Sequence, residues 1–131
     1  MPVAQKKHLR QVMKERRKKL FQNHPSAGIE ACSHFFNNYK LIPHLKIAGY
    51  WPWGSELDIK PLLYRFIDEG FECALPAITP QGMIFRQWSP NTSLVSGSFT
   101  MLEPPPAAPL VNPDLIFVPL LAFDKEGHRL G

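Results

Sequence analysis

Residues 45–75 contain the pattern that most limits the fold of this chain. Leu45 to Trp51 is a short apolar stretch of strand length, ended by proline and glycine residues. A helix with one apolar face follows, and Gly70 stops it before a second apolar stretch from Phe71 to Leu75. A strand, a helix and a strand over this length build a parallel sheet covered by helices, normally with a right-handed crossover. The sequence therefore predicts an α/β fold.

Two helices are expected before this unit. From about Ala4 to Gln22, apolar residues recur at helical spacing among basic ones, and Pro25 closes the segment. Ser26 is placed to cap a second helix that reaches Asn37. Asp58 is placed to cap the helix between the two strands, whose apolar face holds Leu62, Leu63, Phe66 and Ile67.

The second half of the chain predicts further strands. Met83 to Trp88 alternates enough to form one, whereas the proline-rich stretch from Leu102 to Pro113 predicts an extended linker or loop. Leu115 to Val118 is a continuous apolar run, which favours a central strand buried on both faces. The carboxyl ends of such strands are where ligands bind in open α/β sheets.

Length and composition fit one domain covering residues 1–131. Apolar residues make up 44% and charged residues 20%, as in ordinary globular proteins. The N-terminus has no signal-peptide core, no apolar run approaches the roughly 18 residues of a membrane span, and the two cysteines show no metal-ligand spacing. We therefore expect a cytoplasmic protein with reduced thiols and no membrane association.

Positive charge is concentrated in the first predicted helix. This segment has eight Lys and Arg residues and one acidic residue, Glu15, so its net charge is 8 − 1 = +7. The rest of the chain carries 7 − 10 = −3, which gives the total of +4. Lys6 and Arg10 are four residues apart and share a helix face, where they could clamp a polyphosphate. The alternative is a solvated basic face. RNA binding is a weaker alternative, because no aromatic interleaving or second basic patch accompanies the helix.

An aromatic corner follows the first predicted strand. Tyr50, Trp51 and Trp53 lie close to Glu56, with Gly54 between them. Flat rings beside a carboxylate suit a nitrogen-rich heterocycle, because the carboxylate would accept hydrogen bonds from the N–H groups of the heterocycle. The alternative is a core aromatic cluster with a surface glutamate.

The last residues offer one more candidate site. Asp124 could hold Mg²⁺ through water or anchor a loop, and Gly127 to Gly131 could begin a phosphate-binding turn. A plain turn glycine and a surface arginine at position 129 are the alternatives. None of the five histidines is paired with a serine or cysteine, so no nucleophilic triad is predicted.

These motifs, taken in order, form a pattern that spans nearly the whole chain and resembles the 5-formyltetrahydrofolate cyclo-ligase family. The pattern consists of Lys6-x-x-Leu9-Arg10, Tyr50-Trp51-Pro52, Glu56-Leu57-Asp58, Leu75-Pro76, Met83-x-Phe85, Glu103-Pro104, Pro113 to Pro119, and Phe123-Asp124-x-x-Gly127-x-Arg129-Leu130-Gly131.

The resemblance implies a three-layer, Rossmann-like fold of the CoA-transferase-like kind, with a mostly parallel sheet flanked by helices. It also implies a reaction in which ATP, with Mg²⁺, converts 5-formyltetrahydrofolate to 5,10-methenyltetrahydrofolate and releases ADP and phosphate. Phosphorylation of the formyl oxygen makes it a leaving group that the folate N10 can displace, so the protein needs to position charges and supplies no nucleophile.

The matching positions assign the site. Lys6 and Arg10 match the family's ATP-binding pair, and Arg129, Leu130 and Gly131 match the opening of its phosphate loop, with Arg129 as the catalytic candidate. Trp51 and Glu56 match folate-contacting positions.

The resemblance also predicts a C-terminally truncated chain. The family's loop continues through further glycines to a Tyr-Tyr-Asp stretch whose aspartate serves Mg²⁺, which leaves Asp124 as the metal candidate here. We expect little activity from these residues alone. The alternative function is an inactive remnant that binds folate or a partner. A monomer is expected, and a cut sheet edge would allow self-association.

Overall fold

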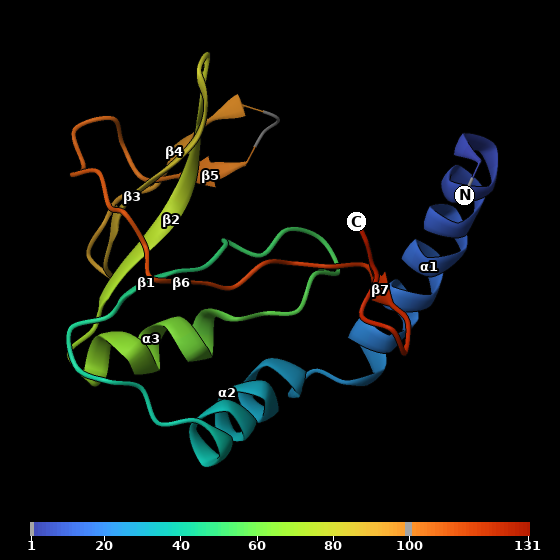
Figure 1. Cartoon of the computed structure of the whole chain (residues 1–131), viewed down its shortest axis with the longest axis horizontal. Coiled ribbons are helices and arrows are strands. Elements are labelled where there is room, and N and C mark those ends of the chain that lie inside the picture. The colour runs from blue at the N-terminus through green and yellow to red at the C-terminus, as the bar shows by residue number, and fades with distance from the viewer. Residues whose placement is uncertain (1, 99–100) are drawn as a thin grey trace.

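The computed structural model describes residues 2–98 and 101–131 and arranges a mixed sheet, three helices and two small hairpins (Figure 1). In chain order the elements are α1 (Val3–Asn23), α2 (Ala27–Asn38), β1 (Lys46–Ala48), α3 (Lys60–Asp68), β2 (Glu72–Thr79), β3 (Gly82–Trp88), β4 (Val95–Ser96), β5 (Leu102–Glu103), β6 (Leu115–Ile116), β7 (Ala122–Phe123) and β8 (Arg129–Leu130).

The main sheet has four strands in the order β3-β2-β1-β6. Strand β1 pairs in parallel with β2 and with β6, so that Ile47 lies opposite both Cys73 and Leu115. Strands β2 and β3 form an antiparallel hairpin with Thr79 opposite Gly82. The predicted α/β fold with a mostly parallel sheet flanked by helices is therefore confirmed.

The strand–helix–strand unit forms where the sequence predicted it. Gly70 ends α3 with a φ of 91°, a left-handed conformation that glycine adopts at little cost. The Asp58 carboxylate accepts a hydrogen bond from the Lys60 backbone N–H at 3.0 Å, although Ile59 is the residue at the N-cap. Asp58 thus stabilises the first turn of α3 as predicted, but it lies one residue before the N-cap and not at the N-cap itself.

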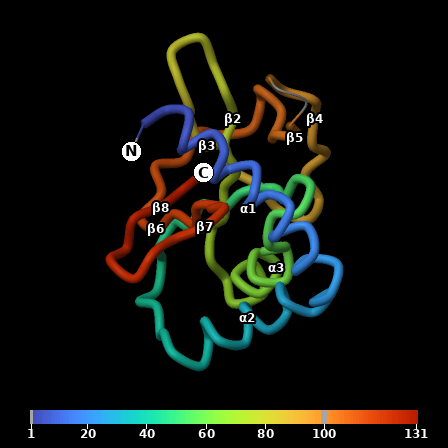
Figure 2. Tube along the Cα trace, turned by 90° about the vertical axis from the view of Figure 1, so that its right-hand side faces the viewer, coloured from blue at the N-terminus to red at the C-terminus, as the bar shows by residue number. Residues whose placement is uncertain are grey.

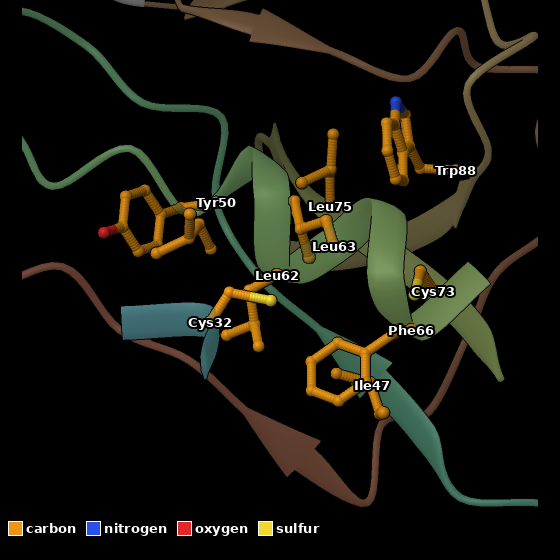
Figure 3. Close-up of a cluster of buried hydrophobic side chains, with 10 residues drawn as sticks. Cys32, Ile47, Tyr50, Leu62, Leu63, Phe66, Cys73, Leu75 and Trp88 are labelled. Atoms are coloured by element: carbon orange, nitrogen blue, oxygen red, sulfur yellow. The ribbon is translucent and has the colours of Figure 1, made fainter. Parts of the chain in front are cut away.

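Helices α2 and α3 cover one face of the sheet and enclose the main core (Figure 3). Phe66 of α3 is fully buried beside Ile47 of β1. Its ring centroid lies 5.4 Å from that of Phe35 and 5.7 Å from that of Phe117, so α2, α3 and the residue after β6 meet at this side chain. Burying an aromatic ring in such a cluster is a major source of stability.

The opposite face of the sheet is covered by the proline-rich segment. Val111 packs against Ala48 and Ala74, and its N–H donates to the Phe85 carbonyl oxygen at 2.9 Å. The Arg86 guanidinium donates to the Ala108 carbonyl oxygen at 2.8 Å. The predicted loop from Leu102 to Pro113 is therefore fastened along β3, and its first residues form β5, which pairs with β4.

The prediction that Leu115 to Val118 is buried on both faces is wrong. Among the described residues β6 pairs only with β1, and it is only two residues long. Phe117 packs against the main core on the helix side, whereas Ile116 and Val118 on the other face are 46% and 49% exposed. A continuous apolar run does not reveal how far each face of a strand is covered.

Helix α1 and the hairpin of β7 and β8 lie beyond the carboxyl ends of β1 and β6. Figures 1 and 2 both place α1 and this hairpin side by side, and in Figure 1 they lie to the right of α2 and α3. The helix confirms the predicted first helix, and none of its residues is buried. No helix in the described part of the chain is long and apolar enough to cross a membrane.

Candidate functional site

A hollow of about 370 Å³ lies between α1 and the β7–β8 hairpin. Helix α1 lines it with Lys6, Leu9 and Met13, which recur at helical spacing and therefore share one face. The hairpin supplies the opposite wall with Ala122, Phe123, Asp124, His128, Arg129 and Leu130. The sequence predicted Lys6, Arg129 and Leu130 at one site, and the structure brings these three together.

The hollow combines two cations with an apolar surface. Phe123 and Arg129 are direct cross-strand partners, so both side chains leave the same face of the hairpin. Phe123 is 76% exposed, which is unusual for a phenylalanine. In the described part of the chain neither Lys6 nor Arg129 forms an ion pair. This arrangement suits a ligand with a flat apolar part and a strongly negative part.

The other predicted anion-binding residues stand beside this hollow. Arg10 lies one turn after Lys6 on α1, is exposed and does not line the hollow. Gly131 has a φ of 101°, and a side chain there would come within 2.8 Å of the Leu121 Cβ atom. Glycine is thus required at position 131 both by the backbone conformation and by the space available.

Asp124 organises the tip of the hairpin. Its Oδ1 accepts hydrogen bonds from the backbone N–H groups of Glu126 and His128, both at 2.9 Å, and its Oδ2 lies 2.8 Å from His128 Nδ1. These hydrogen bonds, those from His128 first, lower the pKa of the Asp124 carboxyl. Asp124, Glu126 and His128 could bring three ligand atoms within 4.8 Å of one another. Because the Asp124 oxygens already have partners, the tip fits a loop anchor better than a Mg²⁺ site.

Trp51 and Glu56 lie in the loop that follows β1. Trp51 is half-buried, with its ring centroid 6.0 Å from that of Trp88 and 5.3 Å from Lys60 Nζ. The Glu56 carboxylate accepts a hydrogen bond from the Trp53 backbone N–H at 2.8 Å and so closes its own turn. Neither residue lines the hollow beside Lys6. Their role in folate binding stays a prediction.

Tyr50 holds this loop in place. Its buried hydroxyl donates to the Leu57 carbonyl oxygen at 2.8 Å, across the segment that carries Trp51 and Glu56. Burial, followed by the nearby Glu56 and Asp58 carboxylates, raises the pKa of the phenol above its usual range. The hydroxyl therefore remains a protonated donor.

Tyr50→Phe is expected to lower the free energy of unfolding by about 1 kcal/mol, because the Leu57 carbonyl loses a hydrogen bond while the ring still packs. Urea unfolding would measure this change. Tyr64→Phe is the matched control, since Tyr64 is 41% exposed and its hydroxyl bonds to no described residue. Equal stability of the two variants would contradict the role given to the Tyr50 hydroxyl.

Sequence reasoning missed Arg17. Its Nε donates to Ser55 Oγ at 2.9 Å, which connects α1 to the loop after β1. The residue is one of many cations in α1, and nothing in its spacing distinguishes it from its neighbours.

The two cysteines lie in the core of the protein. Cys32 and Cys73 are both buried and unpaired, and burial raises the pKa of Cys73 to about 12. Both side chains belong to the main core. Neither cysteine lines the hollow beside Lys6.

Comparison with known proteins decides the family. The profile of the 5-formyltetrahydrofolate cyclo-ligase family matches residues 2–131. The chain belongs to this family. Among curated cyclo-ligases, that of Haemophilus influenzae is 30% identical over 75% of this chain and 56% of its own length. That of Mycolicibacterium smegmatis is 30% identical over 100% of this chain and 72% of its own length.

A solved structure agrees with the cyclo-ligase assignment. The NMR structure of Aquifex aeolicus 5,10-methenyltetrahydrofolate synthetase superimposes with a TM-score of 0.81 at 30% identity, covering 96% of this chain and 66% of that one. The resemblance read from the ordered motifs is therefore confirmed. The present chain spans little more than half of the Haemophilus influenzae relative and about two thirds of the solved one.

Proposed function

We propose that this cyclo-ligase family member cyclises 5-formyltetrahydrofolate to 5,10-methenyltetrahydrofolate at the expense of ATP, releasing ADP and phosphate. ATP would occupy the hollow between α1 and the β7–β8 hairpin. The observation that carries the proposal is the meeting of Lys6 and Arg129, from opposite ends of the chain, in one hollow. Both positions match the ATP site implied by the family motifs.

The wall chemistry supports a nucleotide in particular. Phe123, Leu9 and Met13 provide apolar area for the base, while Lys6 and Arg129 provide positive charge for the phosphates. An arginine can donate two parallel hydrogen bonds to a phosphate, and a lysine adds a point charge. Phosphoryl transfer needs mainly positioning and charge neutralisation, which these residues can offer. Arg10 would approach the phosphates from the edge of the hollow.

The chemistry of the folate explains why no protein nucleophile is needed. Transfer of the γ-phosphoryl group to the formyl oxygen forms an O–P bond and releases ADP. N10 of the same folate then attacks the formyl carbon and gives up its proton to solvent, and phosphate leaves with that oxygen as the ring closes. The Trp51 and Glu56 corner, beyond the carboxyl end of β1, is the proposed pterin contact.

Magnesium would enter with the nucleotide. Mg²⁺ is commonly held by substrate phosphates and waters, with one or two carboxylates. Asp124 is the candidate carboxylate on this hairpin, but its oxygens are engaged in the turn. The residues described here therefore offer no dedicated Mg²⁺ cage.

Calorimetry with Mg-ATP tests the nucleotide site. Lys6→Ala and Arg129→Ala should each weaken binding about tenfold, the size expected from losing one charge-assisted hydrogen bond of about 1.5 kcal/mol. Lys7→Ala is the matched control, because Lys7 is the next residue of α1, is exposed and lies outside the hollow. Equal weakening by all three changes would indicate a diffuse charge effect and refute the site.

Turnover tests the reaction itself. Formation of 5,10-methenyltetrahydrofolate and ADP in equal amounts would support the cyclo-ligase proposal. Folate binding without ADP formation would favour the alternative of a folate- or partner-binding module. Binding should weaken in Glu56→Ala if that carboxylate contacts the pterin, and unchanged affinity would remove Glu56 from the site.

The same proposal places the protein in the cytoplasm as a monomer, with ATP and 5-formyltetrahydrofolate as partners and neither nucleic acid nor membrane. The free thiols of Cys32 and Cys73 agree with a reducing compartment. The open side of β6 offers backbone groups for self-association. A dimer mass in solution would contradict the monomer.

A further inference from the structure

Helix α1 is attached to the rest of the protein by few contacts. None of its residues is buried, and its inner face touches its surroundings through half-buried side chains such as Leu9 and Met13. Among the described residues, Arg17 alone donates side-chain hydrogen bonds from α1 to other elements. Among the described residues, Arg17 is therefore the polar attachment of α1, beside the apolar contacts of Leu9 and Met13.

Arg17 connects three parts of the proposed site. Its Nε donates to Ser55 Oγ at 2.9 Å, and its Nη1 donates to the Leu120 carbonyl oxygen at 3.4 Å. Ser55 belongs to the loop that carries Trp51 and Glu56, and Leu120 lies just before β7. One guanidinium thus joins the helix of Lys6 to the loop after β1 and to the hairpin of Arg129.

We propose that Arg17 is a positioning residue that docks α1 and thereby sets where Lys6 stands relative to Arg129. The part of this inference that concerns ATP rests on the proposed function. Lys6 and Arg17 are eleven residues apart, which is about 16 Å along a helix. A tilt of α1 by about 10° about Arg17 would therefore move Lys6 by about 3 Å. A misplacement of about 1 Å can already be costly for a group whose task is to position charge.

An arginine suits this task better than a lysine would. Its planar guanidinium donates in several fixed directions, so it can serve Ser55 and Leu120 at the same time, and these acceptors lie on different segments. Arg17 and Leu120 also line two further hollows along α1, and Ser55 lines one of them. Arg17 stands where those hollows meet, between the Lys6 end of the helix and its exit toward α2.

Hydrogen exchange of the α1 amides tests the docking role without any ligand. Arg17→Ala should speed exchange across α1 about tenfold, because an undocked helix of this length is marginally stable in water. Lys18→Ala is the matched control, since it removes the same charge from the next, exposed residue. Alanine favours helices at least as well as arginine or lysine, so faster exchange could not come from helix propensity.

The pattern of exchange separates docking from general destabilisation. Docking predicts faster exchange in α1 with unchanged exchange in α3, whereas a loss of global stability would affect both. Arg17→Lys should behave like Arg17→Ala, because one ammonium cannot hold both acceptors in the same geometry. Exchange in Arg17→Ala equal to that in Lys18→Ala would overturn the proposal, and so would full rescue by lysine.

Mg-ATP calorimetry on the same variants links docking to the nucleotide. Arg17→Ala should weaken Mg-ATP binding about tenfold while Lys18→Ala leaves it unchanged. An unchanged affinity in Arg17→Ala would overturn the positioning role. If the wild-type protein binds no Mg-ATP, the proposed function fails, while the exchange difference between the two variants would still support docking of α1 by Arg17.

Discussion

Phe66→Ala is expected to lower the free energy of unfolding by about 3–5 kcal/mol, a large share of the stability of a domain of this size. Phe66 is 0% exposed, and four other phenylalanine rings have centroids 5.3 to 5.9 Å from its own. Its removal would leave a cavity at the place where α2, α3 and the segment after β6 meet. Urea unfolding followed by circular dichroism would measure the loss.

Phe123→Ala provides the comparison at an exposed phenylalanine. Because Phe123 is on the surface of the hairpin, its loss should change the free energy of unfolding by no more than about 0.5 kcal/mol. If the nucleotide base rests on Phe123, the same variant should weaken Mg-ATP binding. Similar destabilisation by the two substitutions would contradict the core described here.

Helices α2 and α3 and the parallel strands β1 and β2 could be predicted because their apolar residues are the ones that are buried. The second predicted strand, Phe71 to Leu75, is shorter than strand β2, which continues through Pro76 to Thr79. Strand β1 ends opposite Ala74, so Pro76 pairs only with Phe85 of β3. The Phe85 carbonyl oxygen accepts a hydrogen bond from Val111 on the side away from β2, so the hairpin loses no hydrogen bond at Pro76 and the strand tolerates the proline.

The candidate site was predictable only in part. Lys6 and Arg129 were identified from family motifs, and their meeting at one hollow depends on the path of the chain after β6. Arg17 carries no motif and resembles its basic neighbours, although its hydrogen bonds distinguish it in three dimensions. Spacing along a helix shows which cations share a face, but it does not show which of them meets a partner.

The same limit applies to the aromatic corner. Spacing placed Trp51 close to Glu56, while the folded loop turns Trp51 toward Trp88 and Lys60 and closes Glu56 on its own turn. The aromatic partner of Trp51, Trp88 of β3, lies far along the sequence and could not be inferred from the local pattern. Both alternatives for this corner, a heterocycle site and a core cluster, therefore remain open to the Glu56→Ala test.

Gly28→Ala is expected to lower the free energy of unfolding by about 1–3 kcal/mol, even though alanine is favoured over glycine in helices by about 1 kcal/mol. Gly28 lies in the first turn of α2, and a Cβ atom there would stand 2.0 Å from the Asp58 carbonyl oxygen. The obstacle is backbone, which cannot rotate aside as a flexible side chain can.

Helix α2 must therefore move away from the segment before α3 to admit the methyl group of Gly28→Ala. This movement would loosen the contacts of Cys32 and Phe35 with α3 and the core. Ser33→Ala is the matched control on α2, because Ser33 is exposed and its change to alanine should be neutral or slightly stabilising. Urea unfolding of both variants measures the difference. A Gly28→Ala protein as stable as Ser33→Ala would mean that α2 does not approach the start of α3 as closely as described.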